Sequence, residues 1–132
     1  MGVLRPVLAY VAVLVVMGAL DFAWLTTAVP RLYRPLLGSL LAPQPRMAAA
    51  VLFYLLYGAG VVVLAVLPAH GQWRAAAGYG AILGLIAYGT YDLTNQATLR
   101  DWPVTITLVD MAWGTVLTAV AATTAAWLIA PR

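Results

Sequence analysis

The sequence contains no cysteine, no lysine and no glutamate, and it has a single histidine. Without cysteine, disulfides and thiolate metal sites are excluded, and one histidine without glutamate argues against a zinc site with several ligands. Charged residues make up 8% of the 132 residues, whereas 64% are hydrophobic. A soluble domain usually has about a quarter of its residues charged. The missing charged shell excludes a soluble globular domain and predicts a protein that lies in the lipid bilayer.

All seven basic residues are arginine, and the net charge is +3. On so apolar a chain this charge suits anionic lipid headgroups better than nucleic acid, which requires clustered cations. We therefore expect membrane lipids as partners and no nucleic acid. Arginine without lysine, together with many alanines, is typical of a GC-rich bacterial genome. The sequence has no cofactor motif, so no cofactor is expected.

Four apolar segments are each long enough to cross a bilayer, which takes about 20 helical residues. The chain is expected to form a single domain, residues 1–132, with transmembrane helices over residues 7–29, 47–67, 74–98 and 103–130. Short connections make consecutive helices antiparallel neighbours, so both termini should lie on one side. The predicted fold is an all-α membrane protein, a four-transmembrane-helix antiparallel bundle.

Prolines mark several of the expected helix ends. Pro30 lacks a backbone donor and should close the first helix, and Pro103 suits a first helical position, with Asp101 near the positive end of the helix dipole. Residues 30–46 hold four prolines, three arginines and grouped leucines. This composition fits a short helix or turn in the membrane interface or a connector with snorkelling arginines. Tryptophans near helix ends are typical of interfacial belts, and these are Trp73, Trp102 and Trp127.

The distribution of arginine leaves the membrane orientation nearly undetermined. Four arginines lie on the side of the first and third loops, and three lie on the side of the termini and the second loop. Cytoplasmic loops carry the cation excess, so the first and third loops are favoured as cytoplasmic by a small margin. Insertion in both orientations stays open.

Three aspartates lie inside the predicted spans, although a charge at the bilayer centre costs about 3 kcal/mol or more. With a rise of about 1.5 Å per residue, Asp21 lies roughly 5 Å past the middle of its span, Asp92 about 8 Å past and Asp110 about 10 Å before. Because the helices alternate in direction, all three displacements point to the side of the first and third loops. We therefore predict that the three carboxylates share one site.

Polar and small residues accompany these aspartates at helical spacing. On the third span a stripe recurs every three or four residues and consists of Tyr88, Tyr91, Asp92 and Asn95. Extended backwards, it reaches Gly80 and Gly84, a pair that permits close helix approach in lipid. The second span has Tyr54, Tyr57 and Gly58 at matching depth.

The first and fourth spans share a four-residue motif, because Asp21-Phe-Ala-Trp24 matches Asp110-Met-Ala-Trp113 at three positions. The spacing puts each carboxylate and indole on one helix face, where the indole N–H can donate a hydrogen bond and the ring can line a pocket. No longer similarity supports a duplication. The candidate ligand-binding residues are Asp21, Trp24, Tyr54, Tyr57, Tyr88, Tyr91, Asp92, Asn95, Asp110 and Trp113.

Each aspartate also has a purely structural interpretation. Asp21 can accept hydrogen bonds from tyrosine or tryptophan as a buried link between helices, and Asp110 can do so from threonine or backbone groups. Asp92 and Asn95 can pin the end of the third span near Arg100. Their common depth favours the functional interpretation.

The segments around these residues resemble a known family. The run Tyr88-Gly-Thr-Tyr-Asp-Leu-Thr-Asn95, its continuation through Trp102-Pro103 and the segment Thr107-Leu-Val-Asp-Met-Ala-Trp113 are the most specific parts. With the motifs around Asp21 and Tyr54, they are similar to the bacterial membrane family catalogued as domain of unknown function 2177. The resemblance covers essentially the whole chain, departs from the family at Gln96 and implies a four-helix inner-membrane protein without implying an activity.

Three functions fit these residues. The first is a binding protein with a one-sided polar pocket for a lipid or another amphiphile, serving lipid modification or envelope stress. The second is a membrane enzyme, because burial disfavours the charged form of a carboxylate, so Asp92 or Asp110 can exchange protons near neutral pH. The third is a dimeric proton-coupled transporter of small molecules, although its carboxylate would be expected near mid-membrane. A structural subunit of a larger membrane complex is the fourth interpretation.

Overall fold

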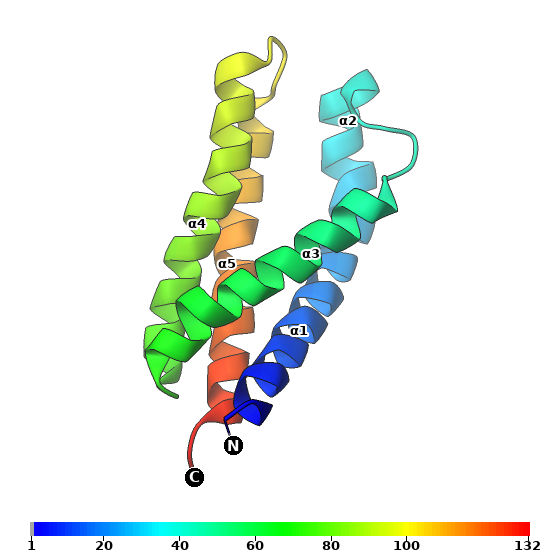
Figure 1. The fold of residues 1–132 in the computed structure, drawn as a ribbon. Coiled ribbons are helices and arrows are strands. Elements are labelled where there is room, and N and C mark those ends of the chain that lie inside the picture. The colour runs from blue at the N-terminus through cyan, green and yellow to red at the C-terminus, as the bar shows by residue number, and fades with distance from the viewer. Residues whose placement is uncertain (1) are drawn as a thin grey trace.

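The computed structural model describes residues 2–132, which form helices joined by short turns, with no strand among them (Figure 1). The helices are α1 (Leu4–Ala28), α2 (Arg34–Leu37), α3 (Met47–Val61), α4 (Trp73–Thr98) and α5 (Val104–Ile129). A π-helical turn, η1 (Val29–Tyr33), joins α1 to α2, and the 3₁₀ turn η2 (Gly38–Leu40) follows. The π-helical turn η3 (Val62–Val66) and the 3₁₀ turn η4 (Leu67–Ala69) extend α3. The described residues thus form four long helical segments, as predicted.

Three of these segments are long and apolar enough to cross a membrane: Leu4–Leu40, Met47–Ala69 and α5. The fourth, α4, has a sufficient length of 26 residues but includes the stripe of tyrosine, aspartate and asparagine. Within that stripe Asp92 points into the bundle and is fully buried, whereas Tyr91 is 56% exposed. The all-α bundle predicted from the apolar segments is confirmed.

The first helix does not end at Pro30, and this prediction was wrong. Its backbone continues to Leu40, over 37 residues. Pro30 lies within η1, where the Arg34 N–H donates to the carbonyl of Val29, five residues earlier. In a regular α-helix a proline removes one hydrogen bond and clashes with the carbonyl four residues before it, and a widened π turn accommodates both defects. The expected interfacial segment is therefore an extension of the first helix, followed by a loop over residues 41–46.

Helix α3 crosses the other helices diagonally, so the bundle is not symmetric (Figure 1). Helices α4 and α5 run side by side and antiparallel, and α1 packs along α5. The second half of α3 lies against α1, where the Tyr10 hydroxyl donates to the Leu55 carbonyl at 2.8 Å, whereas its extension η3 packs against α4. Both termini lie at one end, as predicted, while α2 and the α4–α5 turn lie at the other (Figure 1).

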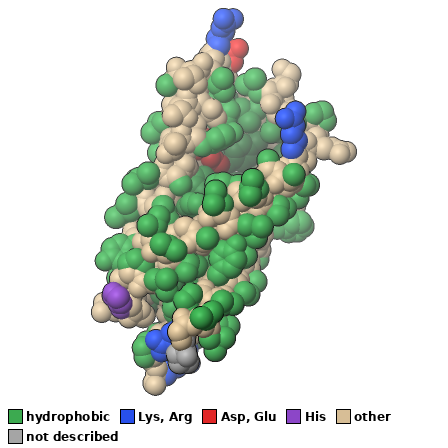
Figure 2. All heavy atoms as spheres, viewed as in Figure 1, with side chains coloured by type: hydrophobic (Ala, Val, Ile, Leu, Met, Phe, Trp, Pro, Cys, Tyr) green, Lys and Arg blue, Asp and Glu red, His purple; other side chains and the backbone are tan. Residues whose placement is uncertain are grey.

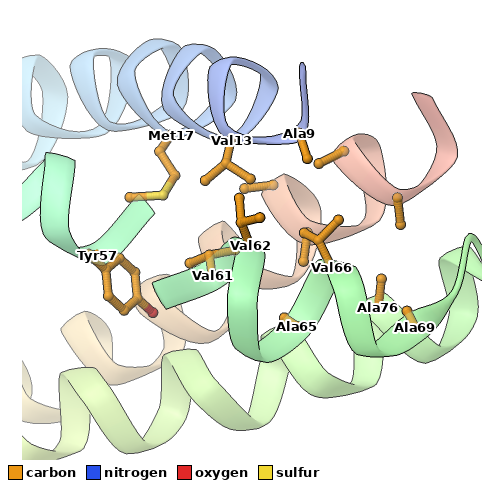
Figure 3. Packing of buried hydrophobic residues seen from close by; sticks show 14 of the residues in the cluster. Ala9, Val13, Met17, Tyr57, Val61, Val62, Ala65, Val66, Ala69 and Ala76 are labelled. Carbon is orange, nitrogen blue, oxygen red and sulfur yellow. The ribbon is translucent and has the colours of Figure 1, made fainter. Parts of the chain in front are cut away.

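The end that holds both termini is tightly packed, and we call it the closed half. Its core includes Ala9, Val13 and Met17, spaced four residues apart on α1 and fully buried. These side chains point toward α3 and its extension, where Val61 and Val62 meet them (Figure 3). Alanines from α4 and α5 complete this cluster of mostly small side chains.

Glycines allow α4 and α5 to approach closely, as the sequence predicts for Gly80 and Gly84. A Cβ atom added at Gly80 would lie 2.8 Å from the carbonyl oxygen of Thr118 and 2.9 Å from the Cβ atom of Ala122. A Cβ atom at Gly84 would meet the backbone of Gly114. Small residues at such positions let transmembrane helices gain van der Waals contact.

The opposite end, the open half, has a smaller apolar cluster of Ala28, Tyr33, Trp102 and Ile106. Trp102 is only 7% exposed, so its predicted place in an interfacial belt was wrong. Its Nε1 atom donates to Oγ1 of Thr107 at 3.0 Å, and its carbonyl accepts from Nε2 of Gln96 at 2.8 Å. Trp102 therefore anchors the α4–α5 turn.

The other residues predicted near the membrane surface are accessible. Trp73 and Trp127 are about half exposed, at the start of α4 and the end of α5. Asp101 is exposed as well, but α5 has no side-chain cap, so Asp101 does not cap it.

Candidate functional site

A pocket lies in the open half, where α3 diverges from α4. It has a volume of about 280 Å³. Figure 2 shows a hollow above α3, between α4 and the α1–α2 segment, with an acidic side chain visible inside it. The residues that line the pocket come from three helices and are Phe53, Ala87, Tyr88, Tyr91 and Asp110.

Asp110 is the one charged residue in that lining, and its carboxylate has a defined partner. The hydroxyl of Tyr33 donates to Oδ1 of Asp110 at 2.8 Å. Nε1 of Trp24 in turn points at the Tyr33 hydroxyl at 3.4 Å. These two hydrogen bonds, from Trp24 to Tyr33 and from Tyr33 to Asp110, hold the Asp110 side chain in a fixed position.

Tyr33 was missed in the sequence because it lies beyond Pro30, where no helix was expected. The inward positions on α1 include Met17, Asp21 and Ala28, and Tyr33 follows five residues after the last of these. The π turn adds a residue to one helical turn, which shifts the register so that Tyr33 points inward and is 8% exposed. The available signal was a lone tyrosine within a leucine-rich and arginine-rich segment.

Asp21 forms a link between three helices and lies outside the pocket lining. It is 8% exposed. Its Oδ1 atom accepts a hydrogen bond from Nε1 of Trp113 on α5 at 2.8 Å, and its Oδ2 atom accepts one from the hydroxyl of Tyr54 on α3. These contacts match the structural interpretation of Asp21, because two neutral donors offset part of the desolvation of a buried carboxylate.

The two Asp-x-x-Trp motifs meet across the α1–α5 interface. The indole rings of Trp24 and Trp113 stack with their centroids 4.6 Å apart and their planes at 9°. The indole of the second motif donates to the carboxylate of the first. Neither ring lines the pocket, and the stacked pair instead joins α1 to α5.

Asp92 differs from the other two intramembrane aspartates. It is fully buried, and no donor group within residues 2–132 offers a hydrogen bond to either of its carboxyl oxygens. The acidic group that interacts with it is the carboxyl of Asp110. The predicted pairing of Asp92 with Arg100 was wrong, because Arg100 is exposed and does not reach either oxygen.

The sequence predicts that the three carboxylates share one site, but Asp110 alone of the three lines the pocket. Asp110 is close enough to interact electrostatically with both Asp21 and Asp92. Across the described part of the chain no group of three acidic or histidine side chains is arranged to hold a metal ion. The three aspartates thus form a chain of neighbours without a common ligation point.

The remaining candidates divide between the pocket and the core. Tyr88 lies over Gly114, and Tyr91 is 56% exposed with its ring edge against Trp102. Tyr57 is outside the pocket, and its hydroxyl shares a hydrogen bond of 2.8 Å with Oγ1 of Thr118. Asn95 lies one turn beyond Tyr91 and does not line the pocket.

The chain was also compared with known proteins. The model of one family, described as "Predicted membrane protein (DUF2177)", matches residues 6–127. The matched range includes every residue of the pocket and of the polar contacts around it. Comparison with curated proteins finds no match, and comparison with solved structures finds none either. The family match confirms the resemblance carried by the motifs around Asp21, Asp92 and Asp110.

Proposed function

The chain belongs to this family of membrane proteins, and from that premise we propose that it binds one lipid or lipid-like amphiphile in the inner membrane of a bacterium. The pocket between α3 and α4 carries the proposal, because it combines a carboxylate with aromatic walls inside a bundle of apolar helices. Ligand sites usually join a mostly apolar lining to a few placed polar groups. Asp110 supplies the polar group here.

The size of the pocket limits the part of the ligand that enters it. Its volume of about 280 Å³ is just below the range of about 300 to 1,000 Å³ that is usual for drug-sized ligands. It therefore accommodates a head group or a short segment, and the rest of the amphiphile extends along the apolar surface of α3. Leu52 and Leu56 are well exposed on that surface. Binding then serves lipid modification or an envelope stress response.

A second candidate function is acid–base catalysis on the same ligand. The observation in its favour is the buried Asp92 carboxyl beside Asp110 at the pocket. Two carboxyl groups in contact can supply and accept a proton during an isomerisation or hydration. A comparison of lipids from deletion and wild-type cells would detect the accumulated substrate, which binding alone does not produce.

The binding proposal is tested by filling the pocket. Ala87→Phe places a ring in the pocket lining, whereas Ala112→Phe makes the same change at an exposed position of α5. Native mass spectrometry of the protein released from mild detergent is expected to detect a retained amphiphile on the wild type and on Ala112→Phe. Retention should fall at least tenfold for Ala87→Phe, a loss of about 1.4 kcal/mol in binding. Equal retention by both variants would place the bound lipid elsewhere.

A further inference from the structure

The acid pair at the inner end of the pocket points to the class of amphiphile, an inference that rests on the proposed function. We propose that the pocket selects an amphiphile with a cationic head group, and that the cation takes the place of one proton shared by Asp92 and Asp110. The ligand class is an amphiphilic amine or quaternary ammonium compound. Two observations carry the proposal. One is the lining of the pocket, and the other is the buried Asp92 carboxyl, to which no described group donates a hydrogen bond.

The lining favours a cation over an anion. Asp110 contributes the negative charge, and Phe53, Tyr88 and Tyr91 contribute aromatic rings. Ammonium groups are attracted to aromatic faces, most strongly where water is excluded. A phosphate head group would instead face a carboxylate with no arginine in the lining, and like charges in contact cost several kcal/mol.

The buried Asp92 carboxyl, which accepts no hydrogen bond, indicates where the pair holds its proton. Asp21 accepts hydrogen bonds from Tyr54 and Trp113, and Asp110 accepts one from Tyr33. Asp92 has no donor among the described residues and is fully buried. An isolated ionised carboxylate in such a place is strongly disfavoured. Asp92 therefore holds a proton, and its O–H has the Asp110 carboxylate as its acceptor.

The other titratable groups around the pair do not replace Asp92 in this role. They come from every neighbouring helical segment and are Asp21 on α1, Tyr33 on η1, Tyr54 and Tyr57 on α3, and Tyr88 and Tyr91 on α4. Asp21 already has two donors, and the Tyr33 hydroxyl directs its proton at Asp110. None of these groups is basic, so the pair is not neutralised by a neighbour.

The exchange balances in charge and atoms. When the cation enters beside Asp110, the O–H bond of Asp92 breaks and its proton passes to water. The two carboxylates of Asp92 and Asp110 then face the cation in place of the proton. Because a monovalent cation replaces a proton, the net charge of the two carboxylates and the bound cation equals that of the two carboxylates and the proton. Two carboxyl groups in contact bind and release protons as a unit, so the exchanged proton belongs to the pair.

This exchange makes cation binding depend on pH. Protons and the cation compete for the pair, so the apparent affinity for the cation should fall about tenfold for each unit that the pH is lowered where the proton is bound. An uncharged amphiphile of the same chain length does not displace the proton. Its binding is expected to be weaker and independent of pH.

The test uses the purified full-length protein in maltoside micelles, with dodecyltrimethylammonium as the cationic probe and monododecanoylglycerol as the uncharged one. Calorimetric titration in two buffers of different ionisation enthalpy counts the protons released for each bound cation. One proton per cation is expected for the wild type and for Asp101→Asn, which makes the same chemical change at an exposed site. Asp92→Asn should abolish the proton release and the pH dependence of the affinity.

The outcomes separate this inference from the proposed function. Binding of the cation without proton release, or equal binding of both probes, would overturn the exchange while leaving the amphiphile pocket in place. If neither the cationic nor the uncharged probe binds, and no lipid is retained in native mass spectrometry, both the proposed function and the exchange are contradicted. If Asp92→Asn does not fold, the pH dependence measured on the wild type alone decides: a constant affinity contradicts the proposal.

Discussion

The closed and open halves are built from the same helices but are stabilised in different ways. On α1, the closed half uses Ala9, Val13 and Met17, which interdigitate with the valines of α3 and its extension (Figure 3). One turn after Met17 the same face carries Asp21, and Trp24 follows in the next turn. There the contacts between helices become hydrogen bonds and ring stacking. The open half also contains the pocket.

The difference shows how side-chain size determines where a membrane bundle can open. In lipid there is no hydrophobic force between helices, so close approach requires small residues or hydrogen bonds. Glycine and alanine let α4 and α5 touch along the closed half. In the open half the Tyr88 ring lies over Gly114. The rings of Trp24 and Trp113 stack between α1 and α5, and hydrogen bonds such as that from Trp113 to Asp21 join the helices. Hydrogen bonds and ring stacking hold a few side chains of the open half in place without filling all the space between the helices.

The largest effect is expected from placing a side chain in the closed half. Gly80→Val adds a Cβ atom 2.8 Å from a backbone oxygen that has no freedom to move aside. We expect a loss of about 3 kcal/mol in the free energy of unfolding, the upper range for overpacking. Equilibrium unfolding in mixed micelles measures this loss.

Gly78→Val is the matched control, because a Cβ atom there meets nothing within 4 Å. Its unfolding free energy should stay within about 0.5 kcal/mol of the wild type. Similar stabilities for the two variants would mean that the α4–α5 interface does not depend on close backbone approach, and the contrast between the halves would be lost.

A smaller effect is expected from removing one directional contact in the open half. Trp113→Phe deletes the donor to Asp21 and weakens the stacking on Trp24. We expect a loss of about 1 kcal/mol, typical of one hydrogen bond between transmembrane helices. The near-ultraviolet circular dichroism of the stacked indoles should disappear as well.

Trp127→Phe, at an exposed position near the end of α5, is the control for that change. It should alter neither the stability by more than about 0.5 kcal/mol nor the dichroism of the stacked pair. An unchanged spectrum in Trp113→Phe would mean that the two indoles do not stack.

Much of this arrangement follows from the sequence by counting residues along helices of alternating direction. The depths counted for Asp21, Asp92 and Asp110 predict that these residues lie near one another, because the rise per residue is constant, and Asp110 interacts electrostatically with the other two. The spacing of Gly80 and Gly84 predicts a close helix approach on that face of α4, and the structure shows that α5 is the partner. Local periodicity fixes which residues share a face and a level.

What the sequence did not predict depends on tertiary contacts. Pro30 predicts a helix end because proline lacks a backbone donor, and nothing in the local sequence indicates that a π turn accommodates it. The register shift in that turn is what places Tyr33 on Asp110. The burial of Trp102 likewise depends on a contact with Thr107 across a turn. That Asp92 has no donor is a property of its surroundings, which no spacing along α4 specifies.

Solid-state nuclear magnetic resonance on protein in bilayers, with aspartate carboxyl carbons labelled, tests directly whether acidic groups of different helices meet. The chain has four aspartates, so every carboxyl signal can be assigned by single Asp→Asn variants. A strong carbon–carbon correlation between Asp92 and Asp110 is expected, with none to the exposed Asp101. The absence of the Asp92–Asp110 correlation, with all four signals resolved, would contradict the convergence on which the pocket and the proton exchange both depend.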